Sequence, residues 1–132
     1  MPTAIETLSS IPLFAKLSGR QLRKILKSTS EDRYEPGDVI VREGGRTETL
    51  FVVLSGTAKV VRNGRTVARR SEGEFFGEIS MIDLRPRVAS VVADTQMRCL
   101  VLYHHDLRRL VTGDAQVAWN LLQTLAGRVR DE

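Results

Sequence analysis

The spacing of hydrophobic and polar positions changes twice along the chain, at about residues 34 and 103. In residues 1–34, the motif Ser-Gly-Arg-Gln at 18–21 has the form of a capping box, and apolar residues at helical spacing follow it. In residues 35–103, short apolar runs alternate with turn residues. Residues 104–132 return to helical spacing. The pattern predicts one domain with an N-terminal helical segment, a central β-structure and C-terminal helices.

The central segment is predicted to be antiparallel. Its apolar runs are rich in Val, Ile and Phe, as strands are, and lie at residues 39–41, 50–54, 58–62 and 88–92. Asn63-Gly64 predicts a tight hairpin, because both central residues of that turn need positive φ. Turn signals recur at intervals of roughly 8–12 residues, which favours a sandwich or barrel over alternating strands and helices.

The last segment predicts two helices. A short one begins at His105 and ends at Gly113, and Asp114 can cap a longer one after it. The apolar residues of the longer helix form two adjoining rows, wide enough to pack against the β-structure. The rows are Val117, Leu121 and Leu125, and Trp119, Leu122, Ala126 and Val129. We expect this packing to bury Trp119 rather than to leave it exposed for a partner.

Length and composition indicate one domain with a core of its own, since the chain has 132 residues, of which 42% are hydrophobic. The longest apolar run, residues 50–54, is far shorter than the roughly 18 residues that span a bilayer. Lys16 is the only basic residue before residue 18 and follows the apolar residues there, unlike in a secretory signal. We therefore expect a cytoplasmic protein without a membrane segment.

The formal net charge of +4 comes from 20 basic and 16 acidic residues, which are interleaved along the chain. The sequence has no basic stripe with interleaved aromatic residues. We therefore expect neither nucleic acid nor a membrane surface as a partner.

The residue types that enzymes need are scarce. Cys99 is the only cysteine, which leaves no pair for an internal disulfide or a cysteine-based zinc site, and we expect a buried, inert thiol. His104 and His105 are the only histidines, and as neighbours at a strand end they would point to opposite faces. We expect no metal site, no catalytic residues and no enzymatic activity.

One stretch, residues 73–91, does not fit the strand pattern. Gly73 and Gly77 are four positions apart and allow close approach of backbone to a neighbour. Residues 79–84 can form a single helical turn, which Pro86 prevents from continuing. The stretch is therefore predicted to be a loop with a short helix.

This loop has the residues of a small anion site. Exposed amides at the start of the turn, with Arg87 as the counter-charge, suit a phosphate, and Glu78 can accept hydrogen bonds from a sugar hydroxyl. In the alternative interpretation, Glu78 and Arg87 form a surface salt bridge worth about 0–1 kcal/mol. The residues alone leave both interpretations open.

Several motifs follow the order and spacing of one known family. In the loop they are Phe76-Gly77-Glu78-Ile79-Ser80-Met81, Pro86-Arg87 and Ala89-Ser90-Val91, and elsewhere they are Ile11-Pro12-Leu13-Phe14, Pro36-Gly37-Asp38-Val39-Ile40, Glu43-Gly44 and the run 50–56. Together they resemble the cyclic nucleotide-binding domain family, and residues 76–91 resemble its phosphate-binding cassette. The resemblance implies a mainly β fold, an antiparallel double-stranded β-helix (jelly-roll) barrel with an N-terminal helix and C-terminal helices.

The resemblance also implies roles for individual residues. Arg87 would pair with the cyclic phosphate, and Glu78 would accept the ribose 2′-hydroxyl. The remaining donors to the ligand would be backbone amides, those of Gly77, Ile79, Ser80, Val88 and Ala89.

The base would lie on an apolar wall made of Val60, Val67 and Ala68, for which plain core packing is the alternative. A lid would come from the last helix, where Arg128 would stack on adenine, with Leu125 or Val129 as apolar alternatives. In the alternative, Arg128 is a solvated residue that complements the helix dipole. Val88 stands where relatives that prefer cyclic GMP often carry Thr or Ser, which favours cyclic AMP as the ligand and leaves cyclic GMP as the second choice.

The expected function is therefore that of a regulatory sensor that binds a cyclic nucleotide and has no catalytic or DNA-binding part of its own. Its output would pass to an effector protein or to a fused effector domain. We expect a monomer or a weak homodimer. The alternative is a degenerate member of the family that acts in protein–protein interaction without a nucleotide.

Overall fold

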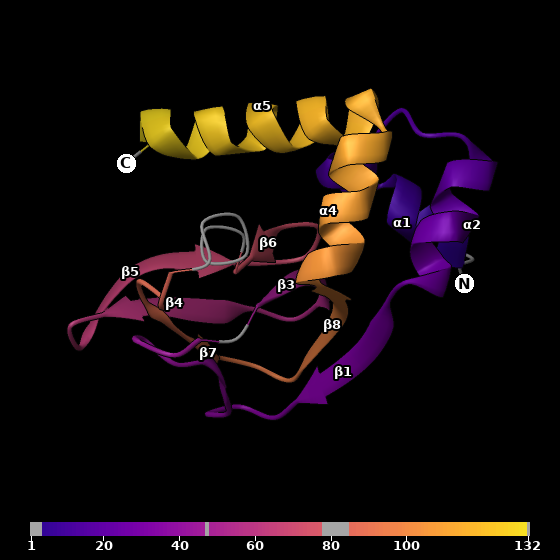
Figure 1. Cartoon of the computed structure of the whole chain (residues 1–132). Helices are drawn as coiled ribbons and strands as arrows, with labels where there is room; N and C mark the ends of the chain where they lie inside the picture. Colours follow the sequence, from indigo (N-terminus) through magenta and orange to yellow (C-terminus); the bar gives the residue numbers. More distant parts are fainter. Residues whose placement is uncertain (1–3, 47, 78–84, 132) are drawn as a thin grey trace. The chain divides into compact units, whose positions relative to one another are not determined.

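The structure, a computed structural model, describes residues 4–46, 48–77 and 85–131 (Figure 1). Its elements form two units, each compact in itself. The sheet unit is residues 29–104, and the helical unit is residues 1–28 together with residues 105–132. The helical unit thus combines the two ends of the chain.

The sheet unit contains eight described strands in two antiparallel sheets of four. One sheet has the order β1-β8-β3-β6 and the other β2-β7-β4-β5. The strands are β1 (Ser30–Tyr34), β2 (Val39–Val41), β3 (Thr49–Ser55), β4 (Ala58–Arg62), β5 (Arg65–Arg70), β6 (Phe75–Phe76), β7 (Ser90–Ala93) and β8 (Met97–Tyr103). The mainly β jelly-roll with helices before and after it, as predicted, is confirmed.

Side chains of both sheets share one apolar core. Alternate residues of β8 (Met97, Cys99 and Val101) belong to it, as the two-residue period of a strand requires. The rings of Phe51 on β3 and Phe76 on β6 stack with their centroids 5.0 Å apart. This stacking therefore fixes Phe76, the residue before Gly77, where the predicted phosphate-binding loop begins, against the core.

The hairpin predicted at Asn63-Gly64 joins β4 to β5, and both residues have positive φ, 52° and 77°. Several other strands differ from the prediction, since β6 lies in the stretch expected to form a loop and β8 was not among the predicted runs. β7 begins at Ser90 and not at residue 88, because the segment before it pairs with the turn at Gly44-Gly45. β1 lies inside the segment expected to be helical, and its charged, mostly exposed sequence carries no apolar run that could have predicted it.

The helical unit contains α1 (Ala4–Ser9), η1 (Pro12–Phe14), α2 (Gly19–Lys27), all but the first residue of α4 (His104–Gly113), and α5 (Ala115–Asp131). The predicted capping box begins α2, where the backbone N–H of Gln21 donates to Ser18 Oγ at 3.2 Å and the Ser18 N–H donates to Gln21 Oε1 at 2.7 Å. Asp114 caps α5 as predicted, since its Oδ1 accepts from the backbone N–H of Gln116 at 3.0 Å. Among the described residues, no helix combines the length and the hydrophobicity needed to cross a bilayer.

α5 packs on η1 through the face that carries Val117, Asn120 and Leu121, which are all buried. The Asn120 amide donates to the carbonyl oxygens of Leu13 and Ala15, at 3.0 and 2.8 Å. Trp119 lies on another side of the helix and is 58% exposed, so the expectation that it is buried is wrong. The two apolar rows form one stripe in the sequence, but the contact with η1 buries only part of it.

Candidate functional site

Arg87 is a buried arginine, only 4% exposed, in the segment that leads from the loop to β7. Its Nη1 donates to the carbonyl oxygen of Gly77 at 2.6 Å, and its Nη2 donates to the carbonyl oxygen of Thr49 at 2.8 Å. The side chain therefore points to the place where the predicted phosphate-binding loop begins, and it links that place to the first residue of β3.

The backbone of Arg87 is fixed as well. Its N–H donates to the carbonyl oxygen of Gly45, and its own carbonyl oxygen accepts from the N–H of Gly44, both at 2.8 Å. The turn at residues 44–45 and the strand β3 thus hold the arginine from its two ends. A guanidinium held in this way is preorganised, so little side-chain freedom is lost when it binds an anion.

Gly77 is the residue that the guanidinium approaches most closely. Its φ of +92° is one that L side chains rarely adopt. A Cβ at this position would lie 2.6 Å from the Thr49 carbonyl oxygen and 2.9 Å from Arg87 Nη1. Both the conformation and the space require glycine here, in agreement with the close approach predicted from the sequence.

An apolar surface lies on the neighbouring hairpin. Val67 on β5 is 54% exposed, and Val88, directly after the arginine, is 46% exposed. Val60 on β4 is half-buried, packs against the core and pairs in register with Ala68. Core packing thus accounts in part for Val60 but not for Val67, which leaves much of its side chain available for a ligand.

The hairpin and the arginine segment are joined by a side chain that the sequence did not single out. Arg62, at the end of β4, donates from Nε to the carbonyl oxygen of Val88 at 3.2 Å. Thr49 and Gly45 were also missed as parts of the arginine's surroundings. In the sequence, Gly45 was recognised only as a turn residue. Thr49 comes just before an apolar run, which indicates a strand but does not show that the Thr49 carbonyl oxygen lies beside Arg87.

The remaining predicted site residues are distributed as follows. Ala89 is buried beside Arg87 and Val88 in the sheet unit. Glu78, Ile79 and Ser80 lie outside the described residues. Arg128 is a half-buried residue of α5 in the helical unit. The structure thus brings Gly77, Arg87, Val88 and Ala89 together, and Arg62 connects this segment to the hairpin that carries Val60, Val67 and Ala68.

The thiol of Cys99 is buried, as predicted. Cys99 is fully buried on β8, and burial, followed by the nearby charge of Asp32, raises the pKa of its thiol to about 12. Burial and Asp32 also raise the pKa of Tyr34. Within the described ranges, no three His, Cys, Asp or Glu side chains are grouped as a metal ion would need.

Comparison with known proteins agrees with the resemblance seen in the sequence. The chain is 29% identical over 104 residues to a cAMP-dependent protein kinase regulatory subunit of Hypocrea atroviridis, covering 79% of this chain and 22% of that protein. The chain thus spans about a fifth of the length of that curated relative.

Solved structures share the fold over nearly the whole chain. A cyclic nucleotide-binding domain from Methylobacillus flagellatus superposes with a TM-score of 0.85 at 28% identity, covering 97% of this chain and 77% of that one. The regulatory subunit of a cAMP-independent protein kinase A from Trypanosoma brucei superposes with a TM-score of 0.82 at 28% identity, covering 92% and 46%. The family model described as "Cyclic nucleotide-binding domain" matches residues 31–114. The chain therefore belongs to the cyclic nucleotide-binding domain family.

Proposed function

We propose that this chain binds cyclic AMP, with the cyclic phosphate at Arg87, and acts as a regulatory sensor. The single observation that carries the proposal is the buried guanidinium of Arg87 beside the Gly77 backbone. A guanidinium whose donors are held in a fixed, buried geometry suits charge-assisted hydrogen bonds to a phosphate, which offers several acceptor oxygens. Membership of the family and the apolar surface next to the arginine support the same ligand.

The apolar surface supports a purine base as the other half of the ligand. The exposed side chains of Val67 and Val88 would contact it, together with Val60 and Ala68. These side chains offer dispersion and burial but no hydrogen bond. Since Val88 has no hydroxyl to meet a guanine, adenine is favoured, by about 0.5–1.5 kcal/mol for one missing hydrogen bond.

Further contacts are proposed by analogy with the family. Glu78 accepts the ribose 2′-hydroxyl, and the amides of Gly77, Ile79, Ser80, Val88 and Ala89 complete the phosphate site. Arg128 on α5 stacks on the base as a lid. The sensor is cytoplasmic, a monomer or a weak homodimer, and passes its state to an effector protein or a fused effector domain.

A second function is a protein-interaction module that has lost its nucleotide. The likeness to the regulatory subunit of a cAMP-independent protein kinase A favours this alternative, because that subunit shares the fold although its kinase is described as cAMP-independent. Arg87, Gly77 and Glu78 are all present in this chain, which favours nucleotide binding.

Calorimetric titration of the purified chain with cyclic AMP and with cyclic GMP decides between the two functions. We expect saturable binding of both, with cyclic AMP several-fold tighter. No heat with either nucleotide at concentrations where relatives of this family are saturated would favour the interaction module.

The role proposed for Glu78 has its own test. Replacing Glu78 with Ala removes the acceptor of the 2′-hydroxyl, so we expect weaker binding of cyclic AMP and unchanged binding of 2′-deoxy cyclic AMP. The expected loss is about 1.5–3 kcal/mol, the range for a hydrogen bond to a charged group. Equal losses for the two nucleotides would show that Glu78 has another role.

A further inference from the structure

The excess positive charge of the chain belongs to one unit. The sheet unit has 11 basic and 11 acidic residues, whereas the helical unit has nine basic and five acidic ones, so the net charge of +4 resides in the helical unit. The helix α2 contributes most, because its nine residues include Arg20, Arg23, Lys24 and Lys27 and no acid. All four of these side chains are exposed.

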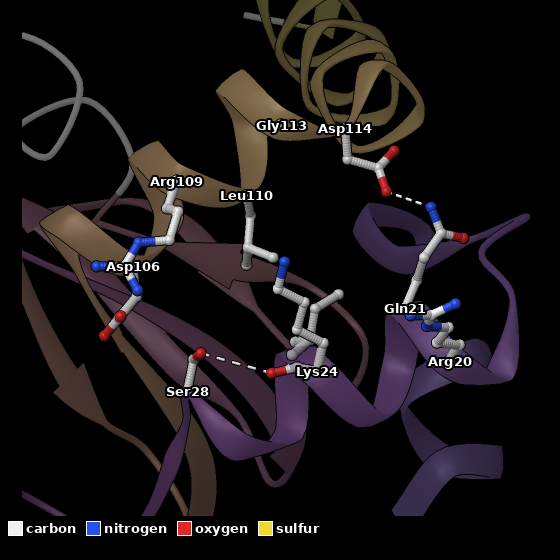
Figure 2. A pocket seen from close by; sticks show the side chains of 10 residues that line it. Arg20, Gln21, Lys24, Ser28, Asp106, Arg109, Leu110, Gly113 and Asp114 are labelled. Carbon is white, nitrogen blue, oxygen red and sulfur yellow. Dashed lines mark hydrogen bonds between the residues drawn. The ribbon is translucent and has the colours of Figure 1, made fainter.

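The helical unit also has a cavity of about 290 Å³ beside this helix. Figure 2 shows Arg20 and Lys24 projecting from α2 and Arg109 and Leu110 from α4. The buried Ile25 and the half-buried Leu110 supply an apolar lining. Three cations thus surround a cavity with an apolar wall.

Each of the two acids of the cavity has a neighbour other than the three cations. Asp114 accepts from the side-chain amide of Gln21, a contact that connects α2 to the start of α5, and from the N-terminal backbone of α5 (Figure 2). Asp106 lies 3.6 Å from His105 Nε2. In the part of the chain that the structure describes, Arg20, Lys24 and Arg109 make no side-chain hydrogen bond or ion pair, so all three charges face solvent or a partner.

We propose that this cavity is a docking site for an acidic, amphipathic peptide segment of a partner protein. The cavity has room for one or two aliphatic side chains against Ile25 and Leu110, and the cations around it would meet carboxylates three or four residues away on the same face of a helix. Charge complementarity of this kind speeds encounter and rejects basic partners.

Two other anionic partners fit the observations less well. A lipid surface is flat and would attract every exposed cation of α2, whether or not it lines the cavity. Single-stranded nucleic acid is bound by stacking on aromatic rings, and none of the described residues that line the cavity is aromatic. The docking site goes beyond nucleotide binding and uses none of the residues proposed for the nucleotide.

The test uses a fluorescein-labelled dodecapeptide of Glu, Leu and Ala, with two Leu at helical spacing, and follows its fluorescence anisotropy with the full chain. Two peptides serve as controls, one with Lys in place of Glu and one with Ala in place of Leu. We expect the acidic peptide with Leu to bind best. Equal binding of the basic peptide would overturn the proposal.

Matched charge reversals separate the site from net charge. The double variant Lys24→Glu/Arg109→Glu changes two residues of the cavity, and Arg23→Glu/Lys27→Glu makes the same change in charge on exposed residues that do not line it. We expect roughly a tenfold or larger loss of peptide binding for the first and a twofold or smaller loss for the second. Equal losses would show that net charge alone attracts the peptide and would overturn the proposal.

Sedimentation with vesicles of phosphatidylserine and phosphatidylcholine tests the membrane alternative. Vesicle binding that is lost equally in both double variants, without binding of the peptide, would assign the cations to a lipid surface and overturn the proposal. Both variants should melt at the temperature of the wild type and keep their affinity for cyclic AMP, since neither changes a residue of the proposed nucleotide site. A variant that melts early is replaced by Lys24→Gln/Arg109→Gln.

Discussion

The sheet unit and the helical unit each contain positive charge for which we propose an anionic ligand, but in opposite physical settings. In the sheet unit the charge is one guanidinium, 4% exposed and fixed by two backbone carbonyls. In the helical unit it is three exposed side chains around a cavity, none with a described partner. The buried site is preorganised and desolvated, whereas the exposed site is hydrated and adaptable.

The difference in burial and rigidity leads us to expect a different selectivity at each proposed site. Around Arg87 a ligand must fit a fixed geometry, because a Cβ on Gly77 would already collide with the guanidinium. At the cavity, flexible lysine and arginine side chains tolerate many arrangements of carboxylates. We therefore expect the sheet unit to select one small molecule and the helical unit to accept a class of acidic segments.

The largest effect is expected from Arg87→Leu. The variant removes the proposed partner of the phosphate, and we expect cyclic AMP to bind more weakly by about 1.5–3 kcal/mol, which is roughly 10–150-fold. Calorimetry measures the loss. Arg33→Leu on β1, an exposed arginine of the other sheet, is the matched control and should bind as the wild type does.

Arg87 is buried, so its replacement also tests the fold. Arg87→Lys keeps the charge but cannot reach the carbonyl oxygens of Gly77 and Thr49 with the same planar fork. We expect affinity between those of the wild type and Arg87→Leu. Full affinity in a folded Arg87→Leu variant, judged by its thermal melting, would contradict the proposed nucleotide site.

The next effect is expected from Gly77→Ala. Positive φ and the contact with the Thr49 carbonyl oxygen both oppose a Cβ, and a strained position of this kind costs about 1–3 kcal/mol. Gly64→Ala is the control, because Gly64 also has positive φ but has nothing within 4 Å of the added Cβ. Urea unfolding of both variants isolates the contact, and equal losses of stability would mean that only backbone strain matters.

A more moderate effect is expected from salt, which should weaken ligand binding to different degrees at the two proposed sites. The Debye length falls from about 10 Å at 0.1 M to about 3 Å at 1 M ionic strength, and exposed charges are screened far more than buried ones. We expect the acidic peptide to lose roughly tenfold in affinity over this range and cyclic AMP roughly threefold or less. Parallel titrations measure both, and equal salt dependence would remove the contrast between a buried and an exposed site.

The last expected effect concerns Cys99 and appears only at alkaline pH. Its pKa is about 12 in the folded chain, against an ordinary value of 9.0, so the folded state holds the thiol proton more tightly than the unfolded state. This contribution to stability is complete below about pH 9 and is lost as pH rises toward 12, with a slope that stays below about 1.4 kcal/mol per pH unit.

The measurement for Cys99 is the free energy of unfolding from pH 8 to 11, compared between the wild type and Cys99→Ala. We expect the wild type to lose more stability over this interval, because the variant has no thiol to titrate. Parallel pH profiles would show that the thiol does not contribute. The folded wild type should also resist iodoacetamide, which reacts with exposed thiolates.

Local signals in the sequence determined much of this molecule. The capping box at Ser18, the hairpin at Asn63-Gly64 and the cap at Asp114 each depend on residues a few positions apart, so they could be predicted and are confirmed. The motifs of the loop were sufficient to indicate the family, because their glycines and arginine stand at fixed spacing. The strand β1 was missed, since its stability comes from pairing with β8, some 67 residues away, and not from its own apolar residues.

Other features depended on contacts between distant segments, which only the tertiary structure decides. The fixing of Arg87 by Thr49 joins residues 38 positions apart, and nothing local to either one predicts it. The exposure of Trp119 follows from which face of α5 meets η1, while the pattern along the helix showed only that it had an apolar stripe. The separation of charge into a neutral sheet unit and a positive helical unit arises because the two ends of the chain fold together, which the even mixture of charges along the sequence concealed.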